Sequence, residues 1–370
     1  METLKNFIRA ELSHRRLMVL AIYILVIVFV SQDAFLYRDP IIKITSVVTK
    51  KTKTVRDGRG GEETLYRQSV KGRVLNGKFK GKTTRADNTY ASSEAFQTKY
   101  RKGDKVFVDM NRSAHSCTLK GHKRDAHLAA LVGLLFMALV LLTGRDGVKT
   151  LLTVIGNTAI YIAGFAKTAS GYKILPVCHI LVILFTAFTL IVLNGLHRKT
   201  FAAIFSSLIV VALLLGLFEL NVRIWGDMDY SSMEYLGTIE NPDEFFRAGI
   251  LIAGLGAIMD VSVTITSSIE EMMRKNADIS KRAVLLSSRE VGYDIMGTMI
   301  NVLLFTYLCG LIPEFVLLMN NNIPYFAIIK LHIPYEITRF LLESIGIVLA
   351  VPVSMLLGLL FMMRKGQVKS

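Results

Sequence analysis

The sequence lacks the common signatures of catalysis and of covalent or metal cross-linking. It holds only 3 cysteines, and without a C-x-x-C pair they predict neither a disulfide framework nor a zinc knuckle. A phosphate-binding loop, a G-x-S-x-G nucleophile turn and an H-E-x-x-H zinc motif are all missing. We therefore expect a protein that is not an enzyme, with no catalytic residue, no metal and no cofactor.

One alternative remains open for a metal site. His115, His122 and His127 stand close to Cys117 in the sequence, and histidine and cysteine side chains are the usual zinc ligands. The group lacks the fixed ligand spacing of a zinc motif, so ordinary histidines and a free thiol are the simpler interpretation.

What the sequence does contain is long apolar runs. Hydrophobic residues make up 52% of the 370 residues and the mean hydropathy is +0.45, which is typical of a polytopic α-helical membrane protein rather than a soluble domain. A run of about 20 apolar residues can cross the hydrocarbon layer as a helix. We expect about eight transmembrane helices, at about residues 17–36, 128–143, 148–166, 174–194, 201–220, 248–268, 292–312 and 341–363.

The first run has two interpretations. Arg15 and Arg16 precede a short apolar core, as in a cleaved signal peptide, but Gln32 stands two residues before Ala34, where cleavage requires a small residue. We therefore predict that residues 1–36 are an N-terminal cytoplasmic tail and an uncleaved membrane anchor.

Residues 37–126 are predicted to form a domain outside the membrane, after the first helix. Its apolar stretches are short and strand-like, at 41–48, 64–75 and 105–110. Turn dipeptides such as Asp57-Gly58 and Asn76-Gly77 stand between them, and Asn76-Gly77 predicts a two-residue hairpin. We expect a small, mostly β barrel or sandwich, which could be OB-like, followed over residues 127–370 by a bundle of about seven helices.

The same segment accounts for nearly all of the net charge of +15. Of the 44 basic residues, 22 lie in 37–126, against 9 acidic residues. An anionic surface ligand, such as lipid headgroups or wall polymers, is one interpretation, and a solvated basic face without a ligand is another. We do not expect nucleic acid as a partner, although OB-like folds often bind it, because the domain is predicted to lie outside the cell.

Basic residues near the ends of the helices predict the orientation. With the N-terminus in the cytoplasm, the cytoplasmic segments carry 16 basic residues and the short outer loops carry 6, in agreement with the positive-inside rule. We therefore predict a multi-pass protein of the cell membrane with both termini cytoplasmic and residues 37–126 extracytoplasmic.

Two of the predicted helices carry a polar stripe. Asn241 and Pro242 indicate that the sixth helix begins there and extends to about Arg274. Polar residues on this helix and the next recur at steps of three or four, so each set shares one face. They are Asp260, Thr264, Ser267 and Glu271 on the sixth helix, and Glu290, Asp294, Thr298 and Asn301 on the seventh.

Because the two helices are antiparallel, we expect the stripes to face each other across a narrow polar seam. The alternative is that the hydroxyl and amide groups only hold helices together, through hydrogen bonds that average about 0.6 kcal/mol. Asp260 fits that alternative least, since an ionised carboxylate at mid-membrane costs at least about 2.5–3.5 kcal/mol and no Lys or Arg obviously lies at its depth. We predict that Asp260 carries a proton or binds a cation on a pathway that includes Thr264, Ser267, Asp294, Thr298 and Asn301.

Around Asp260 the chain resembles a known family. The resemblance is carried by Gly254-x-Gly256-Ala257-Ile258-Met259-Asp260, then Ser262, Ser267 and Glu270-Glu271, and further along by Arg289-Glu290 and Ala350-Val351-Pro352. These residues, with the order of anchor, outer domain and bundle, resemble the YibE/F-like membrane protein family. That family has no assigned activity, and its name implies a paralogous membrane subunit as a partner.

A second, partial resemblance concerns the two polar helices alone. A Gly-rich apolar helix with a mid-membrane Asp, followed by a basic connector and another polar helix, is similar to SecD/SecF and RND-type transporter helices, whose Asp belongs to a proton pathway. This resemblance implies that role for Asp260 only. We expect a transporter or permease component coupled to a proton or cation gradient; the alternative is a non-transporting scaffold or sensor whose basic outer domain binds an envelope partner.

Overall fold

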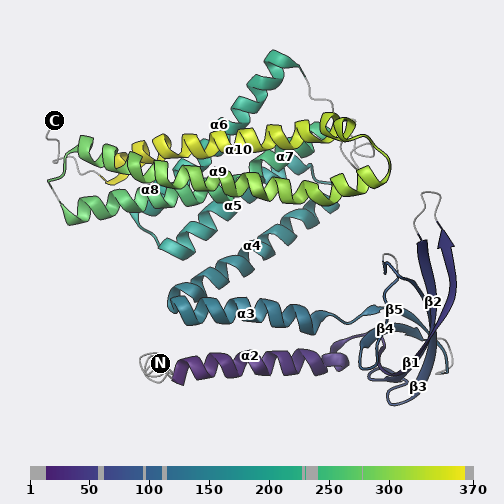
Figure 1. The fold of residues 1–370 in the computed structure, drawn as a ribbon. Helices are drawn as coiled ribbons and strands as arrows, with labels where there is room; N and C mark the ends of the chain where they lie inside the picture. The colour runs from purple at the N-terminus through teal and green to yellow at the C-terminus, as the bar shows by residue number, and fades with distance from the viewer. Residues whose placement is uncertain are drawn as a thin grey trace, which may run out of the picture. The chain divides into compact units, whose positions relative to one another are not determined.

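The computed structural model describes most of the chain in two compact units, residues 1–148 and residues 149–370 (Figure 1). The described residues are 14–56, 62–94, 97–110, 115–226, 230, 241–276 and 278–362, without the side chains of 14–16 and 332. The two terminal tails and the turn predicted at Asp57-Gly58 lie outside the described residues.

The first unit places a β domain at the ends of two apolar helices, α2 (His14–Gln32), which the short helix η1 (Asp33–Leu36) extends, and α3 (Asp125–Thr143). The helices lie side by side (Figure 1). Tyr23 donates a hydrogen bond to the carbonyl of Ala130 at 3.1 Å. No residue of α3 is buried, as expected of a helix whose leucines face lipid.

Five antiparallel strands form the β domain in the order β3-β2-β1-β4-β5. They are β1 (Ile41–Arg56), β2 (Glu62–Val74), β3 (Thr83–Ala91), β4 (Lys105–Met110) and β5 (Cys117–His122). A parallel bridge joins Arg85 of β3 to Ser116 beside β5, so the sheet curls into a partly open five-stranded barrel, the arrangement of an OB-like domain. Its core is apolar and includes the fully buried Ile42 and Val106.

The two-residue hairpin predicted at Asn76-Gly77 is wrong, because residues 75–82 all belong to the connection between β2 and β3. The Asn76 side chain is buried and ties down the start of β1 instead of shaping a tight turn. Its Oδ1 accepts from the Ile41 N–H at 2.7 Å, and its Nδ2 donates to the carbonyls of Tyr37 and Asp39 at 2.9 Å.

The second unit is helical. Its helices are α4 (Arg145–Ala169, which begins in the first unit), α5 (Ile174–Asn194), α6 (Arg198–Trp225), α7 (Pro242–Ala253), α8 (Leu255–Lys275), α9 (Lys281–Asn320) and α10 (Tyr325–Met362). Counting over both units, the described residues contain 8 helical segments long and apolar enough to cross a membrane. The predicted architecture, a polytopic helical protein with a small β domain after the first helix, is confirmed.

Six of the eight spans are longer than predicted, among them the last two. The seventh lies in the 40-residue helix α9 rather than at 292–312, and the last covers Ile333–Met362 rather than 341–363. Charged residues such as Glu290 and Arg339 lower the local hydropathy without interrupting the helix. The prediction therefore placed these helix ends too close to the apolar centre.

Helix α8 forms the centre of the second unit. Ile258, Val261, Ile265 and Ile269 on one face are fully buried, among residues of α5, α6, α9 and α10. Small residues bring α8 and α10 close together in a parallel alignment. A Cβ at Gly346 would lie 3.2 Å from Ile258 Cδ1, and one at Gly358 would lie 2.6 Å from Ile269 Cδ1.

Candidate functional site

The helix predicted from Pro242 to about Arg274 is present as one 34-residue segment, Pro242–Lys275, with a local irregularity at Gly254. Helix α7 ends at Ala253 and α8 begins at Leu255. A Cβ at Gly254 would lie only 2.9 Å from Cγ of Glu343 on α10. Because Gly254 has no side chain, the Glu343 side chain can lie against the backbone there.

Glu343 is the most buried acidic residue of the second unit's described part, with 1% of its surface exposed. The Tyr307 hydroxyl, from α9, donates a hydrogen bond to Oε1 of Glu343 at 2.5 Å. Oε2 has no hydrogen-bond partner among the described residues. Oε2 is therefore available to a proton, a water molecule or a cation. Such a partner would stabilise the carboxyl group, because burying it unpaired is costly.

The cation nearest to Glu343 along α10 is engaged elsewhere. Arg339 lies one turn earlier, where its Nη1 is 3.3 Å from Oε1 of Glu336 and its guanidinium lies 5.5 Å from the centre of the Phe246 ring. Glu336, Arg339 and Glu343 recur at steps of three and four, so α10 carries ionisable groups along one face.

A further ion-paired cluster lies near the N-terminal end of α7. Arg247 lies 2.8 Å from Glu219 of α6 and 2.8 Å from Asp243 of α7, and Asp243 accepts a hydrogen bond from Tyr230 at 2.9 Å. Polar groups thus occur both at this helix end and within the bundle at Glu343.

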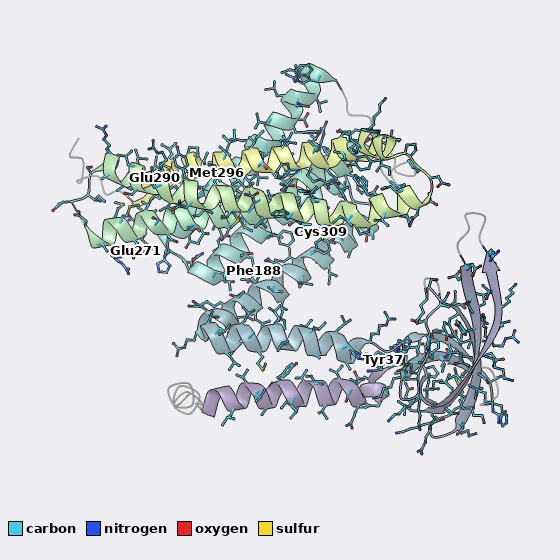
Figure 2. The ribbon with its side chains drawn as sticks, in the orientation of Figure 1. Tyr37, Phe188, Glu271, Glu290, Met296 and Cys309 are labelled. Atoms are coloured by element: carbon cyan, nitrogen blue, oxygen red, sulfur yellow. The ribbon has the colours of Figure 1, made fainter. Side chains whose placement is uncertain are left out.

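The structure places the predicted polar stripes on exposed faces of α8 and α9. Asp260 and Asp294 are exposed, and neither forms an ion pair within the part of the chain that the structure describes. Glu271 lies near the C-terminal end of α8, and Glu290 lies toward the N-terminal end of α9 (Figure 2). In a membrane, these faces would meet lipid or another membrane segment.

The polar side chains of these stripes bond within their own helices. Thr264 donates to the Asp260 carbonyl at 2.8 Å, Thr298 to the Ile295 carbonyl at 2.7 Å, and Asn301 to the Gly297 carbonyl at 2.8 Å. Ser267 is half-buried. The structure shows no hydrogen bond between the two stripes among the described residues, so the seam between them stays a prediction.

Other polar residues of the same helices face the core. Ser262 on α8, Ser288 on α9 and Ser354 on α10 are completely buried, and their hydroxyl groups have no hydrogen-bond partner among the described residues. Ser262 and Ser288 therefore lie on other faces of α8 and α9 than the predicted stripes. Ser354 and Glu343 are buried polar residues of α10.

A shallow groove lies beside the Asp260 turn. It has a volume of about 380 Å³ and is lined by Asn157 and Tyr161 of α4 and by Gly256 and Met259 of α8, among others. At its side, Asn157 donates to Thr189 of α5 at 2.8 Å. Asp260 itself is not among the residues that line the groove.

The alternative metal group does not assemble in the described residues. No cluster of three or more His, Cys, Asp and Glu side chains is suited to hold a metal ion there. His122 lies 3.8 Å from Asp104, and the buried Cys117 thiol lies 3.7 Å from the Arg85 carbonyl.

Sequence reasoning missed Glu343 as a site residue because the last span is predicted at about 341–363, which puts Glu343 at the start of that span. The span begins ten residues earlier, at Ile333, which moves Glu343 into the bundle. The signal was present, since Phe340–Leu342 and Ile345–Ala350 are apolar on both sides of it apart from Gly346.

Family models match nearly the whole chain. The YibE/F-like protein model matches residues 131–364, and the model of the YibE/F family N-terminal domain matches residues 35–122. No curated protein and no solved structure matches the chain significantly.

Proposed function

The chain belongs to the YibE/F-like protein family and is an integral membrane protein whose described residues contain 8 helical segments long and apolar enough to cross a membrane; from this premise we propose that it is a transporter or permease component driven by a proton or cation gradient. Glu343 and Asp260 are the carboxyl groups that take up and release the coupling ion. No catalytic step, resident metal or cofactor takes part in this proposal.

The observation that carries the proposal is the environment of Glu343. A carboxyl group packed against Gly254 and held by a single hydroxyl donor, with no partner for its second oxygen in the described part of the chain, can bind an ion without first breaking a salt bridge. Ionisable residues within membrane helices typically mark ion pathways.

Asp260 has a different place in the proposal. It lies six residues beyond Gly254, or about 9 Å along the helix axis, on the exposed face of α8. An ionised aspartate facing lipid costs at least about 2.5–3.5 kcal/mol, so this face needs a covering segment. We assign that role to a paralogous YibE/F-like subunit, against which Thr264, Ser267, Asp294, Thr298 and Asn301 would complete the ion pathway.

The orientation is part of the same proposal. Both termini lie in the cytoplasm of a cell-membrane protein, in accordance with the basic residues of the short loops. The β domain then lies outside the cell, where its basic surface meets anionic lipids or polymers rather than nucleic acid.

A non-transporting scaffold or sensor is the alternative, and the strongly basic β domain favours it. Complementation of a deletion strain separates the two. Transport predicts that Glu343→Gln and Asp260→Asn lose the phenotype at normal expression, whereas Glu244→Gln, a matched change in the first turn of α7, retains it. If both variants restore the wild-type phenotype while deletion of residues 41–120 abolishes it, the scaffold is correct and the transport proposal is wrong.

A further inference from the structure

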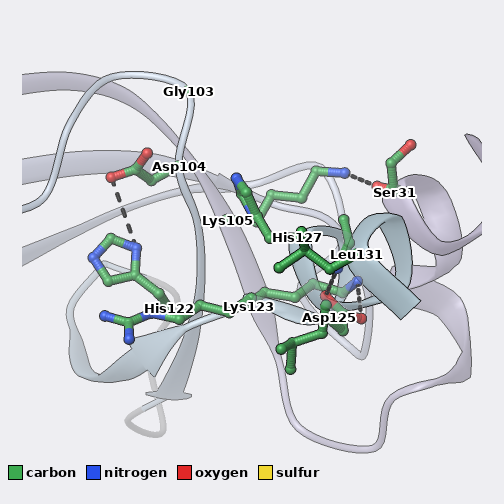
Figure 3. A pocket seen from close by; sticks show the side chains of 12 residues that line it. Ser31, Gly103, Asp104, Lys105, His122, Lys123, Asp125, His127 and Leu131 are labelled. Atoms are coloured by element: carbon green, nitrogen blue, oxygen red, sulfur yellow. Dashed lines mark hydrogen bonds and ion pairs between the residues drawn. The ribbon is translucent and has the colours of Figure 1, made fainter. Parts of the chain in front are cut away.

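A pocket lies in the first unit where the β domain joins α2 and α3 (Figure 3). Its volume is about 720 Å³. One side is formed by Lys105 of β4 and by the segment from His122 to Asp125, and another by the first turns of α3. Since α2 ends and α3 begins at this level, the pocket stands at one end of two membrane spans.

Several charges around the pocket neutralise one another. The Lys123 side chain is 2% exposed, and its Nζ lies 2.5 Å from both Asp33 Oδ1 and Asp125 Oδ2. Burial alone would lower the pKa of Lys123, but the two carboxylates hold that pKa above its ordinary value. Tyr37 donates to the same Asp125 oxygen at 2.6 Å, and His122 faces Asp104 (Figure 3).

Three basic residues of the lining have no carboxylate partner within hydrogen-bonding or ion-pair distance among the residues that the structure describes. Arg124 and His127 are exposed, and neither forms an ion pair in the described part of the chain. Lys105 donates a hydrogen bond to the carbonyl of Ser31, the last turn of α2. Burial, together with the nearby Lys123 and Lys43, lowers the pKa of Lys105, and this outweighs the opposite effect of Asp33 and Asp125.

The remaining wall is apolar and continues along the membrane span. Leu128 and Leu131 line the pocket from α3 and are 61% and 67% exposed. A ligand in the pocket would thus meet cationic groups at the membrane boundary and leucines on the membrane side. A phospholipid has the same two parts in the same order, an anionic headgroup at the boundary and acyl chains on the membrane side.

We propose that this pocket binds one anionic phospholipid, with its phosphate beside Arg124, Lys105 and His127 and an acyl chain along Leu128 and Leu131. The ion pairs of Lys123 fix the β domain at the height that presents these cations to the headgroup. The inference names a ligand for the basic domain and does not rest on the transport proposal, because none of these residues belongs to the second unit.

A soluble phosphate compound shares the headgroup chemistry, and the leucines distinguish the two sources. A soluble anion would gain nothing from Leu128 and Leu131, whereas a lipid would bury an acyl chain against them. Binding should therefore require both halves of the molecule.

The test is a titration of the full-length protein in detergent with phosphatidylglycerol, followed by native mass spectrometry. Glycerol phosphate and phosphatidylcholine serve as the headgroup-only and zwitterionic probes. The variants are Arg124→Gln and, as a control of equal charge change on an exposed strand residue outside the pocket, Arg67→Gln.

The proposal predicts one tightly retained phosphatidylglycerol per chain for the wild type and for Arg67→Gln. Arg124→Gln should weaken retention roughly fivefold, the contribution of one basic residue near an anionic lipid surface. Equal retention in Arg124→Gln and the wild type would overturn the proposal. Binding of glycerol phosphate as tight as that of the lipid would overturn it as well, in favour of a soluble anion.

Discussion

The Tyr307 hydroxyl donates a hydrogen bond to Oε1 of Glu343 at 2.5 Å. This contact joins α9 to α10 beside the point where α7 gives way to α8. It is the only hydrogen bond of the Glu343 carboxyl group among the described residues. The stability of the contact between α9 and α10 is therefore linked to proton or ion binding by the Glu343 carboxyl group.

Removing the Tyr307 hydroxyl tests this link. Tyr307→Phe leaves a buried carboxyl group without its donor, and we expect the free energy of unfolding to fall by about 1–3 kcal/mol. The measurement is unfolding of the purified protein in mixed micelles by titration with dodecyl sulfate. Tyr172→Phe is the control, because Tyr172 is 61% exposed and its change should stay within about 0.5 kcal/mol.

Close packing at Gly254 gives a second prediction. A Cβ at Gly254 would lie 2.9 Å from Glu343 Cγ, whereas one at Gly310 of α9 would meet nothing within 4 Å. We expect Gly254→Ala to lower the free energy of unfolding by about 1–3 kcal/mol, the usual cost of overpacking. Gly310→Ala should not lower it, since alanine favours helix over glycine. Equal melting temperatures for the two variants would contradict the contact.

The ion pairs of Lys123 give a third prediction. Lys123→Met would leave Asp33 and Asp125 without their common cation, and breaking a buried pair in this way costs about 3–5 kcal/mol. We expect faster proteolysis of the β domain in the membrane-embedded protein. Lys120→Met is the matched control, because the Lys120 side chain is 48% exposed and its carboxylate partners are 3.9 and 4.0 Å away, so it should cost about 1 kcal/mol or less.

The exposed face of α8 gives a fourth prediction. A photo-crosslinking residue in place of Thr264 should capture a YibE/F-like membrane subunit in cells that express both proteins. The same residue in place of Leu213, an exposed residue of α6, should capture only lipid. Mass spectrometry of the products identifies the captured chain, and equal capture from both positions would show that the polar face has no dedicated partner.

The sequence predicted which segments are membrane helices better than it predicted which side of each helix faces the core. Apolar runs of spanning length identified the membrane helices because hydropathy depends on composition alone. Spacing placed Asp260, Thr264 and Ser267 on one side of α8, but periodicity cannot tell whether a polar side faces the core or the outside. Ile258 and Ile265 settle that question in the structure by filling the core on the opposite side.

Glu343 and the pocket at Arg124 show a different limit. Glu343 becomes a buried site only because α10 begins well before the apolar run and because Gly254, 89 positions earlier, admits it. The pocket brings β4, the end of α2 and the start of α3 together. Contacts between segments so distant in the chain leave no local pattern, so a single sequence cannot predict them.

The most direct test of the central claim is voltage-driven proton uptake by the purified protein in liposomes that contain a pH-sensitive dye, measured with its family subunit present. A potassium gradient with valinomycin sets the voltage. The wild type and Glu244→Gln should acidify the lumen, and Glu343→Gln should reduce the rate to that of empty liposomes. Equal rates for the wild type and Glu343→Gln, each above those of empty liposomes, would contradict a role for Glu343 in ion coupling.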